Sequence, residues 1–186
     1  IVADFTAIAE RLGKDFAARA AVSDDTDAFV AENYEALRSS HLVEAGVPEE
    51  LGGGGADVAQ LCDMLRVMAH HCGSTALAFA MHTHQVAIPA WRWQHQKVAA
   101  VEPLLRRIAA DRIVLVSSGG SDWINGSGTA RKVEGGYRIS GRKIFSSGAA
   151  AGDVFMTGAV LEEDGARHVL HFGASMKAAE VKILDT

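Results

Sequence analysis

The stretch "IVLVSSGGSDWINGSG", residues 113–128, marks the point at which the character of the chain changes. Its first four residues are apolar and mostly β-branched, which favours a β-strand, and serines and glycines follow at once. Such a loop is either a slack linker between domains or a segment whose backbone lies close to a ligand, because glycine has no Cβ to prevent the approach. Since the loop follows a strand, and composition already changes near Arg112, the sequence favours the second interpretation.

Residues before Arg112 have the apolar periodicity of helices. We expect five helices here, over about residues 4–21, 25–40, 57–71, 74–93 and 97–110. Asp25 and Thr26 are suitable caps for the second helix. The fourth segment is apolar on most sides, which predicts a central, largely buried helix in which His82 or His84 is a hydrogen-bonded core histidine.

Residues after Arg112 have the composition of a β-domain. Most of the 19 glycines lie here, between short apolar runs that predict strands over 113–116, 130–134, 137–140, 143–146, 154–161, 168–172 and 180–184. Gly135-Gly136 is a two-residue hairpin signal. We therefore expect an α+β fold: an N-terminal all-α helical bundle, residues 1–112, followed by a partial antiparallel β-barrel or sheet domain, residues 113–186.

Charge and composition exclude several classes of function. The net charge is −5 and no basic stripe is present, so we expect no nucleic-acid partner. The longest apolar run, residues 72–91, contains histidines and predicts a buried helix, not a membrane span. The first residues lack the pattern of a secretory signal, which indicates a cytoplasmic protein. The chain begins with Ile1, which suggests a piece of a longer protein.

Known cofactor and metal motifs are absent. There is no G-x-G-x-x-G or Walker spacing, and the paired histidines point to different helix faces, so we expect no metal site. Instead, serines gather at two predicted strand ends, and their hydroxyls can donate or accept hydrogen bonds, as the edge of a redox ring requires. Ordinary turn chemistry is the alternative, because Ser and Gly are common in turns. The serines are Ser117, Ser118, Ser121, Ser146 and Ser147.

Four segments in this order, "VPEELGGGGADVAQL", "CGSTALAFAMHTH", "VLVSSGGSD" and "GGYRISGRKIFSSGA", resemble the acyl-CoA dehydrogenase family. The resemblance implies a helical domain, a β-domain and a further C-terminal helical domain. It also implies FAD as cofactor, with Ser121 additionally reaching the substrate. The family's glutamate base comes from the C-terminal part, beyond Thr186, so no catalytic residue is expected in this chain. The implied flavin-binding residues are Val114, Val116, Ser117, Ser118, Gly120, Ser121, Phe145, Ser146 and Ser147.

The resemblance implies an FAD-dependent oxidoreductase that carries out α,β-dehydrogenation of an acyl-CoA or related thioester in fatty acid metabolism. The full-length protein would be a homodimer or homotetramer, and this chain alone would be inactive and hold FAD weakly. Two alternatives stay open. The shortened Gly-Ser-Asp loop and the Phe-Ser-Ser-Gly segment also resemble reduced-flavin-dependent monooxygenases of the same fold. A non-catalytic fragment or binding module is the alternative of another class.

Overall fold

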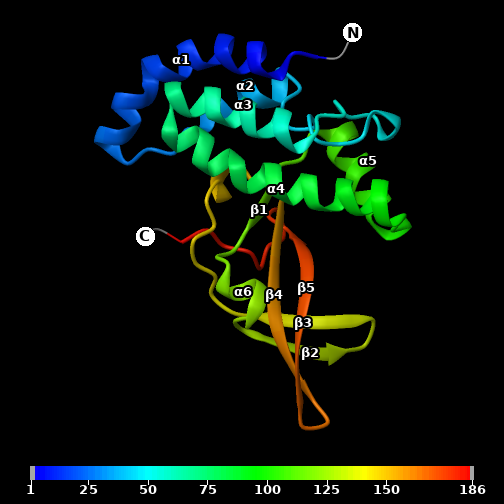
Figure 1. Ribbon diagram of the computed structural model, residues 1–186. Helices are drawn as coiled ribbons and strands as arrows, with labels where there is room; N and C mark the ends of the chain where they lie inside the picture. The colour runs from blue at the N-terminus through cyan, green and yellow to red at the C-terminus, as the bar shows by residue number, and fades with distance from the viewer. Residues whose placement is uncertain (1–2, 185–186) are drawn as a thin grey trace. The chain divides into compact units, whose positions relative to one another are not determined.

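The computed structural model describes residues 3–184, which divide into two compact units on either side of the boundary between Leu115 and Val116 (Figure 1). The first unit is helical and the second contains the sheet, so the expected α+β fold is confirmed.

The helical unit contains five α-helices and two short 3₁₀ turns. Asp57 begins α3 with a capping box, in which its carboxylate accepts from the Gln60 amide and the Gln60 side chain accepts from the Asp57 amide. The helices are α1 (Phe5–Thr26), α2 (Ala31–Ser39), α3 (Val58–His71), α4 (Gly73–Gln96) and α5 (Glu102–Asp111), and the turns are η1 (Glu49–Leu51) and η2 (Ala99–Val101).

The start of the second helix was predicted wrongly. Asp25 and Thr26 do not cap it but form the last turn of α1, which ends where Asp27 adopts the left-handed conformation with φ 54°. The helix α1 continues past the predicted end at residue 21, through Val22 to Thr26. The Thr26 hydroxyl donates to the Val22 carbonyl, which satisfies this polar side chain inside the helix.

Large apolar side chains form the core of the helical unit, and α4 supplies only one face to it. Phe79 and Val86 are buried, whereas Leu77 and Ile88 are exposed, so the expectation of burial around most of α4 was wrong. The helix packs with one face, and its other face stays open in this unit. The largest side chains of this core include Phe16, Tyr34, Leu37, Met64, Met68, Phe79, Leu105 and Ile108.

His82 is the core histidine that the sequence predicted. Its Nδ1 accepts from the Leu115 amide at 3.0 Å, and its Nε2 lies 2.8 Å from the Val43 carbonyl oxygen. Because an amide N–H can only donate, Nδ1 is unprotonated and Nε2 carries the proton. The ring also stacks on Phe79 with centroids 5.3 Å apart. His84, by contrast, is exposed.

The β-unit is built around β4, which has β5 along one edge and β1 and then β2 along the other. The predicted hairpin is present, but its two-residue loop is Glu134-Gly135 and not Gly135-Gly136, because Val133 pairs with Gly136. A small apolar cluster of Ala130, Ala159 and Leu161 lies where these strands meet. The elements are β1 (Leu115–Ser117), α6 (Ser121–Ile124), β2 (Thr129–Val133), β3 (Gly136–Ser140), η3 (Ala149–Ala151), β4 (Val154–Glu163) and β5 (Ala166–Ser175).

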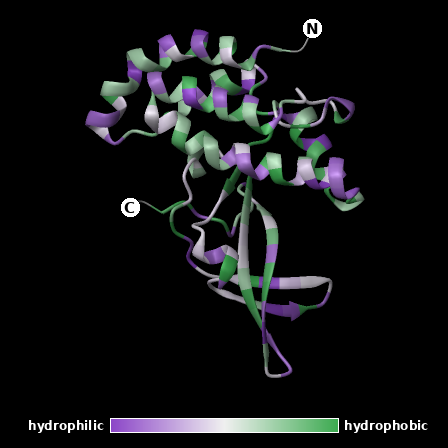
Figure 2. Cartoon of the chain, in the orientation of Figure 1, coloured by the Kyte–Doolittle hydropathy of each residue, from purple (hydrophilic) through white to green (hydrophobic). Residues whose placement is uncertain are grey.

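Three expectations for the β-unit were wrong. The sheet is mixed and not antiparallel, because β2 and β4 run parallel, with Thr129 opposite Val160. Residues 143–146 are not a strand: the Lys143 side chain reaches into the unit, and Phe145 has a φ of 56°, outside the β region. Residues 180–184 form no strand either. Figure 2 shows that hydrophilic residues gather on β2 and at the tip of the β4–β5 hairpin.

Candidate functional site

The two loops that the sequence singled out meet at Gly119. Its amide donates to the Ile144 carbonyl at 3.0 Å, and a Cβ built on Gly119 would lie 3.3 Å from Cδ2 of Phe145. The loop after β1 and the segment 144–145 are therefore in direct contact. Glycine at position 119 permits this approach, because any side chain there would press on the phenyl ring.

The predicted flavin-binding residues fall into a buried and an exposed group. Ser117 and Ser118 are both only 4% exposed, whereas Phe145 is 80% exposed although it is aromatic. The buried residues all come from the first segment, whereas the exposed residues come from both loops. Val114, Val116, Ser117 and Ser118 are buried, Gly120, Ser121, Phe145 and Ser147 are exposed, and Ser146 lies between these classes.

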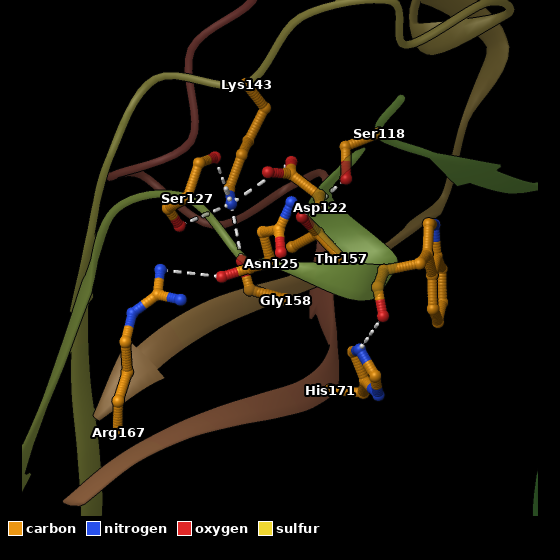
Figure 3. A network of polar contacts seen from close by, with 10 residues as sticks. Ser118, Asp122, Asn125, Ser127, Lys143, Thr157, Gly158, Arg167 and His171 are labelled. Carbon is orange, nitrogen blue, oxygen red and sulfur yellow. Dashed lines mark hydrogen bonds and ion pairs between the residues drawn. The ribbon is translucent and has the colours of Figure 1, made fainter. Parts of the chain in front are cut away.

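Lys143 is the centre of a buried polar network in the β-unit (Figure 3). Its ammonium lies 3.2 Å from the Asp122 carboxylate, and these side chains are only 10% and 7% exposed. It also donates to the carbonyl and hydroxyl of Ser127 at 2.7 and 3.0 Å and to the Gly158 carbonyl. An ammonium has three N–H donors, so these contacts occupy all of its hydrogen-bonding capacity.

Asp122 is the anion that this network surrounds. Burial raises the pKa of its carboxyl, but hydrogen bonds from Ser127, Ser118 and Lys143 and the charge of Lys143 outweigh it, so the pKa lies below the ordinary 3.8. The carboxylate is therefore ionised at neutral pH, and the pair carries two opposite charges. Such a pair needs its hydrogen bonds to offset the cost of desolvation.

Two further contacts fix the loop that carries Asp122. The Ser118 hydroxyl lies 2.7 Å from that of Thr157 on β4, and the Ser118 amide donates to the Met156 carbonyl. On the other side, the His171 ring lies 3.1 Å from the Trp123 carbonyl, with its centroid 5.0 Å from that of the indole (Figure 3). Contacts with the neighbouring strands β4 and β5 thus hold α6 and the loop before it in place.

Sequence reasoning did not assign roles to Asp122, Ser127, Lys143 or Thr157. The signal for two of them was present, since Asp122 ends the Gly-Ser-Asp motif and Lys143 belongs to the Gly-x-Lys segment. Nothing in the spacing shows that these motifs form an ion pair, because Asp122 and Lys143 lie 21 positions apart with a hairpin between them. The structure shows that the two motifs form one unit, joined by buried charges.

Over residues 3–184, no group of three or more His, Cys, Asp or Glu side chains is placed to hold a metal ion. Within the same part of the chain, no helix is long and apolar enough to cross a membrane.

The fold and motifs identify the family. Residues 5–107 match the sequence model of "Acyl-CoA dehydrogenase, N-terminal domain", which is more than half of the chain. The chain therefore belongs to the acyl-CoA dehydrogenase family, as its motifs predicted.

Two relatives of the chain carry the names of oxygenating enzymes. The chain is 30% identical over 174 residues to the pigment production hydroxylase of Rhodococcus sp. (strain ATCC 21145), covering 92% of this chain and 41% of the relative. It is 33% identical over 145 residues to the dibenzothiophene monooxygenase of Mycolicibacterium goodii, covering 75% and 34%. The chain thus spans less than half the length of these relatives.

A solved structure with bound flavin has the same fold. KijD3 in complex with FMN and dTDP-3-amino-2,3,6-trideoxy-4-keto-3-methyl-D-glucose superposes with a TM-score of 0.80 at 28% identity, covering 95% of this chain and 47% of that chain.

Proposed function

We propose that the full-length protein is a flavin-dependent monooxygenase that binds FMN where the Gly119 loop meets the Phe145 segment. The observation that carries this proposal is the contact between the two loops, which leaves the Phe145 ring and the hydroxyls of Ser121 and Ser147 exposed. The pigment production hydroxylase and dibenzothiophene monooxygenase support oxygenation over dehydrogenation. The KijD3 complex supports FMN over the FAD that the sequence suggested.

The residues present fit a flavin. A Cβ built on Gly120 would meet nothing within 4 Å, so the loop leaves open space next to the contact at Gly119. Phe145 provides an apolar surface for a ring, and a positive φ turns its backbone out of the β region. Ser121 and Ser147 carry exposed hydroxyls that suit the polar edge of the isoalloxazine.

Ser118 fits a different role from the predicted one. Its hydroxyl is engaged by Thr157 and Asp122 and is buried, so it supports the loop from behind. Among the predicted residues, Gly120, Ser121, Phe145, Ser146 and Ser147 are the better candidates for direct contact.

The chain's own residues would orient the flavin and hold its surroundings fixed. When bound, a reduced flavin supplies the two electrons that oxygen activation requires. Ser146 and Ser147 would hydrogen-bond the ring, donating or accepting as its redox state changes. The Asp122–Lys143 pair would hold both loops in position, so that the groups that contact the flavin are already in place before it binds.

We infer that the substrate presents a thioether, an amine or an aromatic ring for oxygenation. This inference rests on the dibenzothiophene in the name of the monooxygenase and on the amino sugar bound in the KijD3 complex. We also propose that the full-length protein is cytoplasmic and forms a homodimer or homotetramer.

An acyl-CoA dehydrogenase that uses FAD is the second candidate. It is supported by the match to the family's N-terminal domain and by the Gly-Ser-Asp motif, whose Ser121 would reach the thioester substrate. Flavin titrations on the full-length protein separate the two. A monooxygenase is expected to bind reduced FMN at least as well as FAD and to leave a redox dye unreduced when acyl-CoA is added. Tight FAD binding with acyl-CoA-dependent dye reduction would establish the dehydrogenase.

Loop variants test the flavin position itself. Replacing Ser146 and Ser147 together with alanine is expected to weaken FMN binding about tenfold or more, through the loss of hydrogen bonds to the ring. Ser39→Ala, an exposed change on α2 in the helical unit, is the control and is expected to bind FMN normally. Unchanged FMN affinity and absorption in the double variant would place the flavin elsewhere.

A further inference from the structure

Trp123 on α6 and His171 on β5 form an aromatic pair beside the Gly119 loop. Their ring centroids lie 5.0 Å apart with the planes tilted by 34°, and the His171 Nε2 lies 3.1 Å from the Trp123 carbonyl oxygen. Because a carbonyl oxygen can only accept, this Nε2 carries a proton and donates it. The imidazole thus holds both the backbone and the ring of Trp123, although the indole itself stays partly exposed.

A missing side chain on β4 makes this pair possible. Gly158 lies directly opposite His171 in the β4–β5 ladder (Figure 3). A Cβ built on Gly158 would lie 2.8 Å from the Asp122 carbonyl oxygen and 3.1 Å from Cδ2 of His171. Any larger residue at position 158 would push α6 and the imidazole away from the strand. The position of Trp123 therefore depends on a close approach that only glycine permits.

The chain contains a second pair of the same two residue types. Trp91 and His95 on α4 have ring centroids 5.2 Å apart and a tilt of 36°. They are four residues apart in one helix, so the helical repeat alone brings them together. Trp123 and His171 are 48 residues apart and meet because α6 packs on β5. The pair on α4 is local, whereas the pair on α6 and β5 is built by the tertiary structure.

Trp123 is also attached to the loop that contacts Phe145. The Trp123 amide donates to the Gly120 carbonyl at 3.1 Å, and Gly119, the preceding residue, faces the Phe145 ring. Consecutive Cα atoms are about 3.8 Å apart, so the two aromatic residues are anchored at neighbouring points of one loop. A Cβ built on Gly120 would meet nothing within 4 Å, so open space adjoins both points.

We propose that Trp123 is a specificity-determining residue, whose indole stacks on a flat aromatic ring of the substrate next to the flavin. This inference rests on the proposed function, in which the flavin lies against Phe145. The indole is a large, rigid π surface that favours a second aromatic ring over a saturated one of the same size. His171 is a positioning residue, because it contacts Trp123 and fixes the tilt of the indole. Among the substrate classes of the proposed function, Trp123 selects the aromatic compounds.

Calorimetric titration of the FMN-loaded full-length protein with 2-naphthol and decahydro-2-naphthol tests the proposal, since the two probes share a skeleton and only the first is aromatic. The unmodified protein is expected to bind 2-naphthol about five- to tenfold more tightly. Trp123→Leu is expected to abolish this preference, and Trp123→Phe, which keeps a π surface, to retain most of it. His171→Leu is expected to lower the preference by about two- to threefold, because the indole loses its support.

The matched control is Trp91→Leu, which removes the indole of the local pair and is expected to keep the preference. FMN affinity, measured on the same samples, is expected to be unchanged in Trp123→Leu, which also shows that this variant is folded. A preference that survives in Trp123→Leu, or that Trp91→Leu abolishes equally, would overturn the proposal. Loss of FMN affinity in Trp123→Leu would assign the indole to the flavin and would overturn it as well. Absence of FMN binding to the unmodified protein would instead overturn the proposed function.

Discussion

The helical unit and the β-unit are stabilised by different means. In the helical unit, large side chains such as Phe16, Phe79 and Leu105 are fully buried against one another. The apolar cluster of the β-unit is built on Ala130, Ala159 and Leu161, and a buried ion pair lies beside it. Apolar packing has little directional preference, whereas the polar contacts of Lys143 fix both distance and angle. The β-unit therefore holds its loops in defined positions, which is what a binding site requires.

The largest effect is expected in the helical core. Phe79→Ala removes a fully buried ring that contacts Tyr34 and His82, and it should lower the free energy of unfolding by about 4 kcal/mol. Leu77→Ala on the same helix, 66% exposed in this chain, is the control and should cost less than about 1 kcal/mol. Denaturant unfolding followed by circular dichroism measures both. Equal costs would mean that α4 buries a different face.

The buried ion pair gives the next largest effect. Lys143→Met leaves the Asp122 carboxylate buried without its cation and should cost about 3 kcal/mol. Lys132→Met breaks the exposed pair with Glu163 and is expected to leave the unfolding midpoint nearly unchanged. If both variants unfold alike, the network of Lys143 does not stabilise the β-unit.

The same pair predicts a dependence on pH. The pKa of Asp122 is lower in the folded protein than its ordinary 3.8, so the unfolded state binds the proton more readily. Its contribution to stability is therefore complete above about pH 5 and is lost as the pH falls below 3.8 through the folded pKa. Comparison with Asp122→Asn should show a difference in unfolding free energy that is constant at higher pH and shrinks in acid. A difference that grows in acid would contradict the assignment.

Substitutions at two glycines of the β-unit distinguish the cost of backbone strain from the cost of a steric clash. Gly128 and Gly135 both have positive φ, at 72° and 78°, but only at Gly128 would a Cβ meet another group, 2.5 Å from the Ser140 carbonyl oxygen. Gly135→Ala should cost about 1 kcal/mol from the left-handed conformation alone. Gly128→Ala should cost about 2 kcal/mol or more, since the carbonyl must move as well. Thermal unfolding of the two variants in parallel tests this, and equal midpoints would exclude the contact.

The smallest effect concerns the hydrogen bond behind the Gly119 loop. Ser118→Ala should cost about 1 kcal/mol or more, because the Thr157 hydroxyl and the Asp122 carboxylate both lose a buried hydrogen bond. Thr157→Val should cost a similar amount, and the double variant should cost less than the sum of the two. Strict additivity in this double-mutant cycle would show that the two hydroxyls do not interact.

Much of the architecture could be predicted from the sequence, and the misses have physical causes. Periodicity located the helices because their buried faces recur every three to four residues, as at Phe79 and Val86. It could not show that β2 and β4 run parallel, because strand direction depends on the path of the chain between them. Lys143 was placed in a strand because Ile144 and Phe145 follow it, yet the positive φ of Phe145 takes the backbone out of the β region.

The candidate site, too, could be predicted from the sequence only in part. Serine and glycine clusters marked both loops, and the structure brings these loops together at Gly119. The charges that join them were not predicted, because an ion pair between Asp122 and Lys143 depends on a contact across the fold. The flavin assignment of the individual serines stays a prediction.

Oxygen-isotope labelling tests the central claim most directly. The full-length protein would be supplied with reduced FMN, ¹⁸O₂ and a panel of thioethers, amines and aromatic substrates, and the products analysed by mass spectrometry. The account predicts a product that carries one ¹⁸O atom, formed only when protein and reduced flavin are both present. No labelled product from any of these classes, together with dye reduction driven by an acyl-CoA, would contradict it and establish a dehydrogenase.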